Sequence, residues 1–291
     1  MKKLFCVLWL GLLVPAALAA APPVKSGFFT TSDGVRLHYL EAGRGPALVF
    51  VPGWTMPAWI WEKQIAHFSA HYHVVALDPR SQNESDKPNF GNFPARRSHD
   101  IKELVEHLKL EPAVLVGWSL AVPELLTYAE QFGGAGVRAY VLVDGFAWLD
   151  KPDPQFQSFL LGTYNKMQGD RGPFTEAFVR SMYKKPVTEE YIQRVVAASL
   201  KTPVDSAISM NATAVAREDW RPAIAKLDRP VLIACETGWK NVAADPIQSV
   251  VPSAQVELFA DAGHALFVDD ADRFNALLDD FLAHLPAAPG K

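Results

Sequence analysis

Apolar runs that alternate with helical patterns constrain the fold of this chain more than any other feature. The runs that predict strands cover residues 47–51, 74–77, 113–117, 137–144, 231–235 and 255–259. Helical patterns fall between or after them, over residues 59–70, 95–108, 121–132 and 271–283. Strands that are separated by helices pair in parallel, and the helices then cover both faces of the sheet.

An antiparallel hairpin precedes this alternation. Residues 28–31 and 35–41 predict two strands joined at Asp33-Gly34, a dipeptide that is typical of tight hairpin turns. We therefore expect an α/β protein with a mixed, mainly parallel sheet of about eight strands.

Residues 148–221 interrupt the alternation. Helical patterns follow one another there without a strand, over residues 155–168, 173–183, 189–200 and 204–217. We expect a helical cap, inserted after the sixth strand between two core segments at 22–147 and 222–291. An insertion at this point lies over the carboxyl ends of the strands, so its large apolar side chains should roof an enclosed, mostly apolar pocket. These side chains are Phe156, Phe159, Leu160, Tyr164, Met167, Phe174, Phe178, Met182 and Tyr183.

Residues 1–21 have the features of a secretory signal peptide. Two lysines precede an apolar run over residues 4–14, which is too short to span a bilayer stably. Small residues suited to signal peptidase follow at Ala17, Ala19 and Ala21. We expect cleavage after Ala19 or Ala21 and a periplasmic or secreted protein without a membrane span in the mature chain.

Composition narrows the functional classes. Apolar residues make up 49% and charged residues 21% of the 291 residues, as in a globular protein with a sizeable core. The net charge of −4 offers no basic surplus to neutralise phosphates, so nucleic acid is not an expected partner. The two cysteines are Cys6 and Cys235, and removal of the signal peptide leaves only the second, so no internal disulfide is expected.

The strongest chemical motif is Gly117-Trp118-Ser119-Leu120-Ala121, where a predicted strand runs directly into a helix. A nucleophile elbow needs small residues two positions before and two after the serine, because the backbone is strained and strand and helix approach closely. Here Ala121 replaces the second glycine of the pattern. An ordinary serine helix cap is the alternative, but the position after the fifth strand favours a nucleophile.

Two further segments could complete an acyl-transfer site. Ala262-Gly263-His264 follows the last strand, and histidine has the pKa that a general base needs. Pro52-Gly53-Trp54 follows the first central strand. The backbone N–H groups of Trp54 and of Leu120 could stabilise an oxyanion, although a simple Pro-Gly turn is the alternative for the first.

His67, His71 and His73 are candidate metal ligands. The first two are spaced i, i+4 and could face the same ion. No carboxylate or cysteine completes a recognised ligand pattern there, so we expect a solvated helix face and neither a metal nor a cofactor.

In combination these motifs resemble the α/β-hydrolase superfamily, near its esterases and cofactor-free haloperoxidases. The resemblance runs from residue 27 to the last helix, is interrupted by the cap, and includes Asp78-Pro79-Arg80. It implies the α/β-hydrolase fold, Ser119 as the nucleophile, His264 as the base, and Trp54 and Leu120 as the oxyanion donors.

The acid of the catalytic triad is less obvious. The family most often places it after the seventh strand, at a position that aligns with Trp239 in this chain. The other place that the family uses is the end of the sixth strand, where this chain has Asp144. We expect Asp144 to orient the histidine, with Glu236 as the alternative acid and Asp245 as a further candidate.

These residues predict a serine hydrolase that acts through an acyl-enzyme, with small to medium uncharged esters as substrates. Serine at position 119 disfavours dehalogenase and epoxide hydrolase chemistry, which need an aspartate there. Hydrolysis of lactones, thioesters or C–C bonds, and perhydrolysis, use the same triad and stay open. From another class, a non-catalytic binding protein on a hydrolase scaffold is the alternative. The expected partner is an apolar small molecule.

Overall fold

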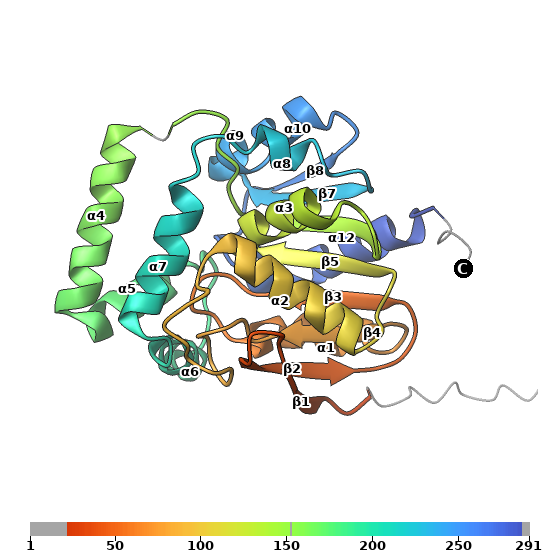
Figure 1. The fold of residues 1–291 in the computed structure, drawn as a ribbon, viewed down its shortest axis with the longest axis horizontal. Helices are drawn as coiled ribbons and strands as arrows, with labels where there is room; N and C mark the ends of the chain where they lie inside the picture. Colours follow the sequence, from red (N-terminus) through yellow and green to blue (C-terminus); the bar gives the residue numbers. More distant parts are fainter. Residues whose placement is uncertain (1–21, 152, 287–291) are drawn as a thin grey trace, which may run out of the picture.

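The computed structural model describes residues 22–151 and 153–286, which form one sheet covered on both faces by helices (Figure 1). The strands are β1 (Lys25–Thr30), β2 (Arg36–Ala42), β3 (Ala47–Val51), β4 (His73–Leu77), β5 (Ala113–Trp118), β6 (Val137–Val143), β7 (Val231–Glu236) and β8 (Gln255–Phe259). Their order across the sheet is β1-β2-β4-β3-β5-β6-β7-β8. β2 pairs antiparallel with β1 and β4, and the other pairs are parallel. The predicted mixed, mainly parallel sheet is confirmed.

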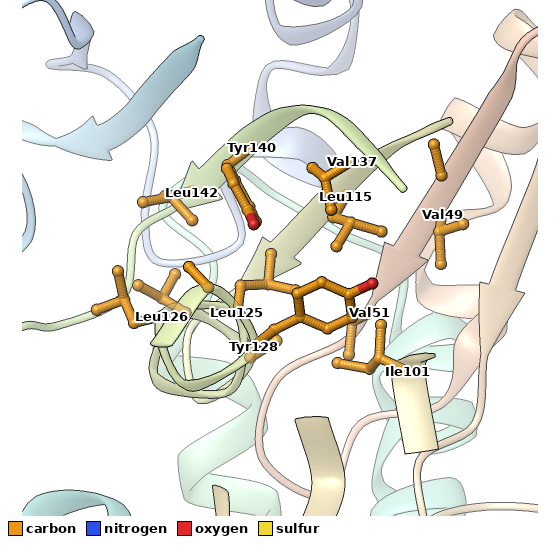
Figure 2. Close-up of a cluster of buried hydrophobic side chains, with 14 of the residues drawn as sticks. Val49, Val51, Ile101, Leu115, Leu125, Leu126, Tyr128, Val137, Tyr140 and Leu142 are labelled. Carbon is orange, nitrogen blue, oxygen red and sulfur yellow. The ribbon is translucent and has the colours of Figure 1, made fainter. Parts of the chain in front are cut away.

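The central strands are buried on both faces, so alternate residues enter different cores. Val49 and Val51 of β3 face a core that Leu125 of α3 and Ile101 of α2 complete (Figure 2). This face is covered by α2 (Pro94–His107), α3 (Ala121–Phe132), α8 (Arg221–Ile224) and α10 (Asp245–Val250). The opposite face, which includes Phe50, is covered by α1 (Glu62–Phe68), α11 (Leu266–Asp269) and α12 (Ala271–Ala283).

Two differences from the sequence prediction concern short helices near the site. The helix predicted over residues 59–70 is divided into the 3-10 helix η1 (Ala58–Trp61) and the shorter α1. The segment after β7, which we expected to be a loop, contains η2 (Thr237–Trp239) and α9 (Lys240–Ala243). Both differences concern helices of one or two turns, whose periodicity is too short to detect in a sequence.

Of the five described helices between β6 and β7, the first four lie at the carboxyl ends of the parallel strands (Figure 1). They are α4 (Pro154–Gly169), α5 (Arg171–Ser181), α6 (Glu189–Leu200) and α7 (Val204–Val215). Side-chain caps fix two of their starts, because Asp153 accepts a hydrogen bond from the backbone of α4 and Thr188 from that of α6. In a third core, Met167 and Met210 of these helices pack with Trp54 of the sheet domain.

The predicted signal peptide lies outside the described residues. Within the part of the chain that is described, no helix has both the length and the apolar character needed to cross a membrane.

Candidate active site

Ser119 lies at a sharp turn between β5 and α3, where its φ angle is +57°. Its N–H donates to the carbonyl oxygen of Val143 in the neighbouring β6, at 2.8 Å. Gly117 makes the turn possible, since a Cβ there would lie 2.8 Å from Leu125 Cδ1. The methyl group of Ala121 is fully buried. The backbone thus has the strained strand-to-helix form of a nucleophile elbow, and the serine side chain stands at the edge of the sheet.

His264 follows β8 and lies between a hydroxyl and a carboxylate. Its Nε2 is 2.9 Å from Ser119 Oγ, and its Nδ1 is 2.7 Å from Asp144 Oδ2. Because an ionised carboxylate only accepts hydrogen bonds, Nδ1–H donates to Asp144 and Nε2 can accept the serine hydroxyl hydrogen. In this tautomer the imidazole can remove the serine proton. The structure therefore brings together the predicted nucleophile, base and acid.

Asp144 is the candidate acid that contacts the histidine. It directly follows β6, has a φ angle of +42°, and has a fully buried side chain. Its Oδ1 accepts a hydrogen bond of 2.8 Å from the Glu236 N–H, and its own N–H donates to the Ala234 carbonyl at 2.8 Å. Asp245 instead forms an ion pair with Lys240. The carboxylate after the sixth strand is thus held from two sides in the orienting position.

Glu236, the alternative acid, lies in the wall of the active-site pocket. Its backbone, and not its side chain, bonds to Asp144. Burial and then the Asp144 carboxylate raise the pKa of Glu236, against the opposing influence of His264 and Lys184. The Glu236 carboxyl is therefore a polar group that faces the substrate space and does not orient the imidazole.

Trp54 and Leu120 place two backbone N–H groups beside Ser119. The turn at residues 52–54 lies against Ser119, because a Cβ at Gly53 would be 2.9 Å from the serine Cβ. Leu120 directly precedes α3. In the described part of the chain, neither N–H donates to another backbone or side-chain oxygen. Two N–H groups without protein acceptors at this place match what an oxyanion hole requires.

The loop that carries His264 is fixed by residues that the sequence analysis did not identify. The Trp118 indole N–H donates to the His264 carbonyl at 2.9 Å. Asp269 accepts a hydrogen bond of 2.8 Å from the Gly263 N–H. A Cβ at Gly263 would lie 2.7 Å from the Met182 carbonyl oxygen, so only glycine lets this loop approach the cap so closely. In the sequence, the only indication of these contacts is the carboxylate of Asp269, five residues after His264.

A pocket of about 1070 Å³ extends from Ser119 beneath the cap. Most of the cap side chains that we expected to roof the site do line it: Phe156, Phe159, Leu160, Phe174, Phe178, Met182 and Tyr183. Two do not. The Tyr164 hydroxyl bonds to Asn211 Oδ1 at 2.7 Å, and Met167 is buried in the core of the cap. The wall that α4 and α5 contribute is therefore largely apolar and aromatic.

The pocket is less enclosed than we expected. Phe159 in its wall is 66% exposed, so this side opens to solvent. Charged side chains other than the triad also line the pocket: Lys166, Asp170, Lys184 and Glu236. A substrate would thus meet an apolar wall together with polar groups of both signs.

The histidines weighed as metal ligands lie apart from this site. His67 contacts Asp279 at 2.6 Å, and His73 contacts Glu41 at 2.7 Å. Over residues 22–151 and 153–286, no group of three or more His, Cys, Asp or Glu side chains is placed to hold a metal ion.

Several known proteins are similar to this chain in sequence or in fold. A family model described as alpha/beta hydrolase fold matches residues 46–271. The non-heme chloroperoxidase CPO-A1 of Kitasatospora aureofaciens is 24% identical over 276 residues, which cover 87% of this chain and 98% of that protein. An esterase of Exiguobacterium antarcticum superposes with a TM-score of 0.80 at 20% identity, covering 88% of this chain and 98% of its own. A bromoperoxidase of Bacillus anthracis superposes with a TM-score of 0.82 at 20% identity, covering 89% and 100%.

Proposed function

Because this chain belongs to the α/β hydrolase fold family, we propose that it is a serine hydrolase that cleaves carboxylic esters through an acyl-enzyme. The observation that carries this proposal is the hydrogen-bonded series from Ser119 through His264 to Asp144, with contacts of 2.9 and 2.7 Å. The unpaired N–H groups of Trp54 and Leu120 lie beside the same serine. Nucleophile, base, orienting acid and oxyanion donors are therefore assembled at one point.

In the proposed mechanism, His264 accepts the Ser119 proton while Oγ attacks the ester carbonyl carbon. The oxyanion that forms is stabilised by the N–H groups of Trp54 and Leu120, and Asp144 stabilises the imidazolium. The intermediate collapses as His264 protonates the departing alcohol. Water then attacks the acyl-enzyme with His264 as base, which releases the carboxylic acid and restores the serine.

The pocket supports small to medium uncharged esters as the substrate class. Aromatic side chains of the cap, among them Phe174 and Phe178, face the space next to Ser119. Each methylene group that such a wall buries adds about 0.8 kcal/mol of binding free energy. A serine at position 119 also disfavours the epoxide and haloalkane reactions of this fold, in which an aspartate is the nucleophile.

Labelling and turnover test this proposal together. A fluorophosphonate probe should label the wild-type protein at Ser119, and the protein should hydrolyse p-nitrophenyl esters. Ser119→Ala should abolish labelling and lower kcat by at least about 10³-fold without changing the fold. A wild-type protein that binds esters but neither turns them over nor reacts with the probe would instead be a binding protein on a hydrolase scaffold.

Perhydrolysis is the second candidate, because a relative of this chain is named a non-heme chloroperoxidase. Hydrogen peroxide would replace water in the attack on the acyl-enzyme, and a peracid would leave while Ser119 regains its proton. Peracid formation from a simple ester and hydrogen peroxide would distinguish this activity from hydrolysis alone. Lactone and C–C bond hydrolysis would use the same residues, and a substrate screen would separate them from ester hydrolysis.

We also propose that the protein is exported to the periplasm or secreted after removal of residues 1–21. The positive start, the short apolar run and the alanines that follow it support this proposal. N-terminal sequencing of the exported protein should find a chain that begins after Ala19 or Ala21.

A further inference from the structure

Gln82 is a fully buried glutamine that uses every hydrogen-bonding atom of its side chain. It lies in the loop after β4, where its Nε2 donates to the Gly53 carbonyl at 3.0 Å and to the Met56 carbonyl at 2.7 Å. Its Oε1 accepts from Arg97 Nη2 at 2.8 Å. Because the two carbonyls need donors and the guanidinium needs an acceptor, the orientation of this amide is determined by its partners.

The first of these carbonyls belongs to the peptide group that carries the Trp54 N–H. A peptide group is planar, so the direction of the Gly53 C=O determines the direction of the Trp54 N–H at its other end. The Met56 N–H also donates to the Gly53 carbonyl, at 3.1 Å. Hydrogen bonds to a carbonyl polarise the peptide and strengthen its N–H as a donor. Gln82 therefore orients and polarises the peptide group that carries the Trp54 N–H, although Gln82 does not line the pocket.

The same network reaches the second oxyanion donor. Arg97 is buried and pairs with Glu124, which lies in the first turn of α3. That helix begins directly after Leu120, the residue that carries the other donor. Arg97 also donates to the Arg80 carbonyl at 3.0 Å, which fixes it in the loop that carries Gln82. The turn at residues 52–54 and the start of α3 are thus joined through one buried glutamine and one buried ion pair.

We propose that Gln82 is a positioning residue of the oxyanion hole, which it holds in register with the start of α3 through Arg97 and Glu124. This inference rests on the proposed serine hydrolase function. It assigns to Gln82 an effect on stabilisation of the transition state and not on substrate binding. Nothing in its sequence neighbourhood predicts this effect, because the contacts join residues that are far apart in the chain.

Gln82→Met tests the proposal, because methionine keeps the length of the side chain and removes both donors together with the acceptor of Arg97. We expect kcat for p-nitrophenyl butyrate to fall by about 10- to 100-fold, less than the 10²- to 10³-fold that complete loss of a donor costs. KM should change by less than about threefold, because ground-state contacts are kept. Affinity for a trifluoromethyl ketone, which forms an oxyanion adduct with the serine, should fall in parallel with kcat. Affinity for an unreactive amide analogue should not fall.

Gln64→Met is the matched control. Gln64 is also fully buried. Its Nε2 donates to the Phe267 carbonyl at 2.9 Å and to Asn275 Oδ1 at 3.0 Å, and neither acceptor belongs to the turn at residues 52–54. It should lower Tm as Gln82→Met does but leave kcat within about twofold of wild type. If Gln82→Met does not fold, Gln82→Glu keeps the size of the side chain and its contact with Arg97 while it still removes both donors.

The outcomes separate this inference from the proposed function. Equal losses of kcat in the Gln82 and Gln64 variants, or an unchanged affinity for the ketone in a folded Gln82 variant, would overturn the positioning role while the serine mechanism stands. A wild-type protein without turnover and without fluorophosphonate labelling would overturn both. A selective loss of kcat and of ketone affinity at Gln82 would support the assignment.

Discussion

Three residues in or next to the site have positive φ angles, although none is glycine: Thr55 (+62°), Ser119 (+57°) and Asp144 (+42°). Conformations of this kind cost about 1–3 kcal/mol each and persist where surrounding contacts enforce them. Ser119 and Asp144 each donate their N–H to the next strand of the sheet, at 2.8 Å. The sheet thus supplies rigid support for the strained residues that we propose as nucleophile and acid.

Asp144 and Glu236 are neighbouring carboxylates that should differ in their effect on catalysis. Asp144→Asn should lower kcat by about 10³- to 10⁴-fold, because an amide favours the wrong imidazole tautomer and cannot stabilise the imidazolium. Glu236→Gln should change kcat by less than about tenfold, since its side chain does not contact the imidazole. Steady-state kinetics of both variants provide the measurement, and the opposite ranking would assign the acid to Glu236.

Glu236 should also affect how stability depends on pH. Burial and then Asp144 raise the pKa of Glu236 in the folded protein. The folded state then binds this proton more tightly than the unfolded chain, so the stabilising contribution is complete below the unfolded pKa of about 4.3 and is lost as pH rises through the folded pKa. The Tm of Glu236→Gln should therefore rise relative to that of wild type as the pH increases above about 4.3. A difference in Tm that does not vary with pH would show that Glu236 is not perturbed.

Among the elements, the cap helices also form hydrogen bonds with the turn after β3. The Trp54 indole N–H donates to the Ala207 carbonyl in α7 at 2.7 Å. The Thr55 hydroxyl lies 2.7 Å from the Ser199 hydroxyl in α6. The turn at residues 52–54 is therefore held by the cap on one side and by Gln82 on the other, so the cap contributes to the geometry of the proposed oxyanion hole.

Phe178 in helix α5 allows a direct test of whether acyl chains bind in the pocket next to Ser119. Phe178 lines the pocket and packs edge-to-face on Trp54, with 5.3 Å between ring centroids. Phe178→Ala should shift the optimum of kcat/KM toward longer acyl chains, and each further methylene that fits should add up to about fourfold, the equivalent of about 0.8 kcal/mol. A series of p-nitrophenyl esters from acetate to decanoate measures the shift.

Phe159 provides the control for this prediction. It lines the same pocket from α4, but it is 66% exposed. Phe159→Ala should leave the optimal chain length unchanged, because little new buried volume is created. An equal shift in both variants would mean that acyl chains bind along the open side of the pocket, and no shift in either would place the acyl chain elsewhere.

For the molecule as a whole, the described residues begin at Pro22, shortly before the first strand. The first described strand is β1, which pairs with β2 from Lys25 to Thr30. A chain that starts at Pro22 should therefore have the same Tm and the same kcat/KM as the full-length chain. A chain that starts at Ser32 loses β1 and the buried Phe29, and should have a clearly lower Tm. A lower Tm for the Pro22 chain would show that the N-terminal residues stabilise the fold.

The sequence by itself determined the features that depend on neighbouring residues. Apolar runs such as 47–51 predicted the buried strands, and five predicted segments coincide with β3, α3, α6, β8 and α12. The small residues around Ser119 predicted the elbow, because a strand that turns directly into a helix needs them. Family membership and fold class followed from these local patterns in combination, and both are confirmed.

Only the tertiary structure decided which distant groups meet. The sequence left Asp144, Glu236 and Asp245 as acids, and the contact of 2.7 Å with His264 distinguishes the first from the others. No sequence pattern predicted the contacts of Gln82 with the Gly53 and Met56 carbonyls. The physical reason is the same in both cases: a side-chain contact depends on how separate loops pack at the sheet edge, and no periodicity within either loop records that packing.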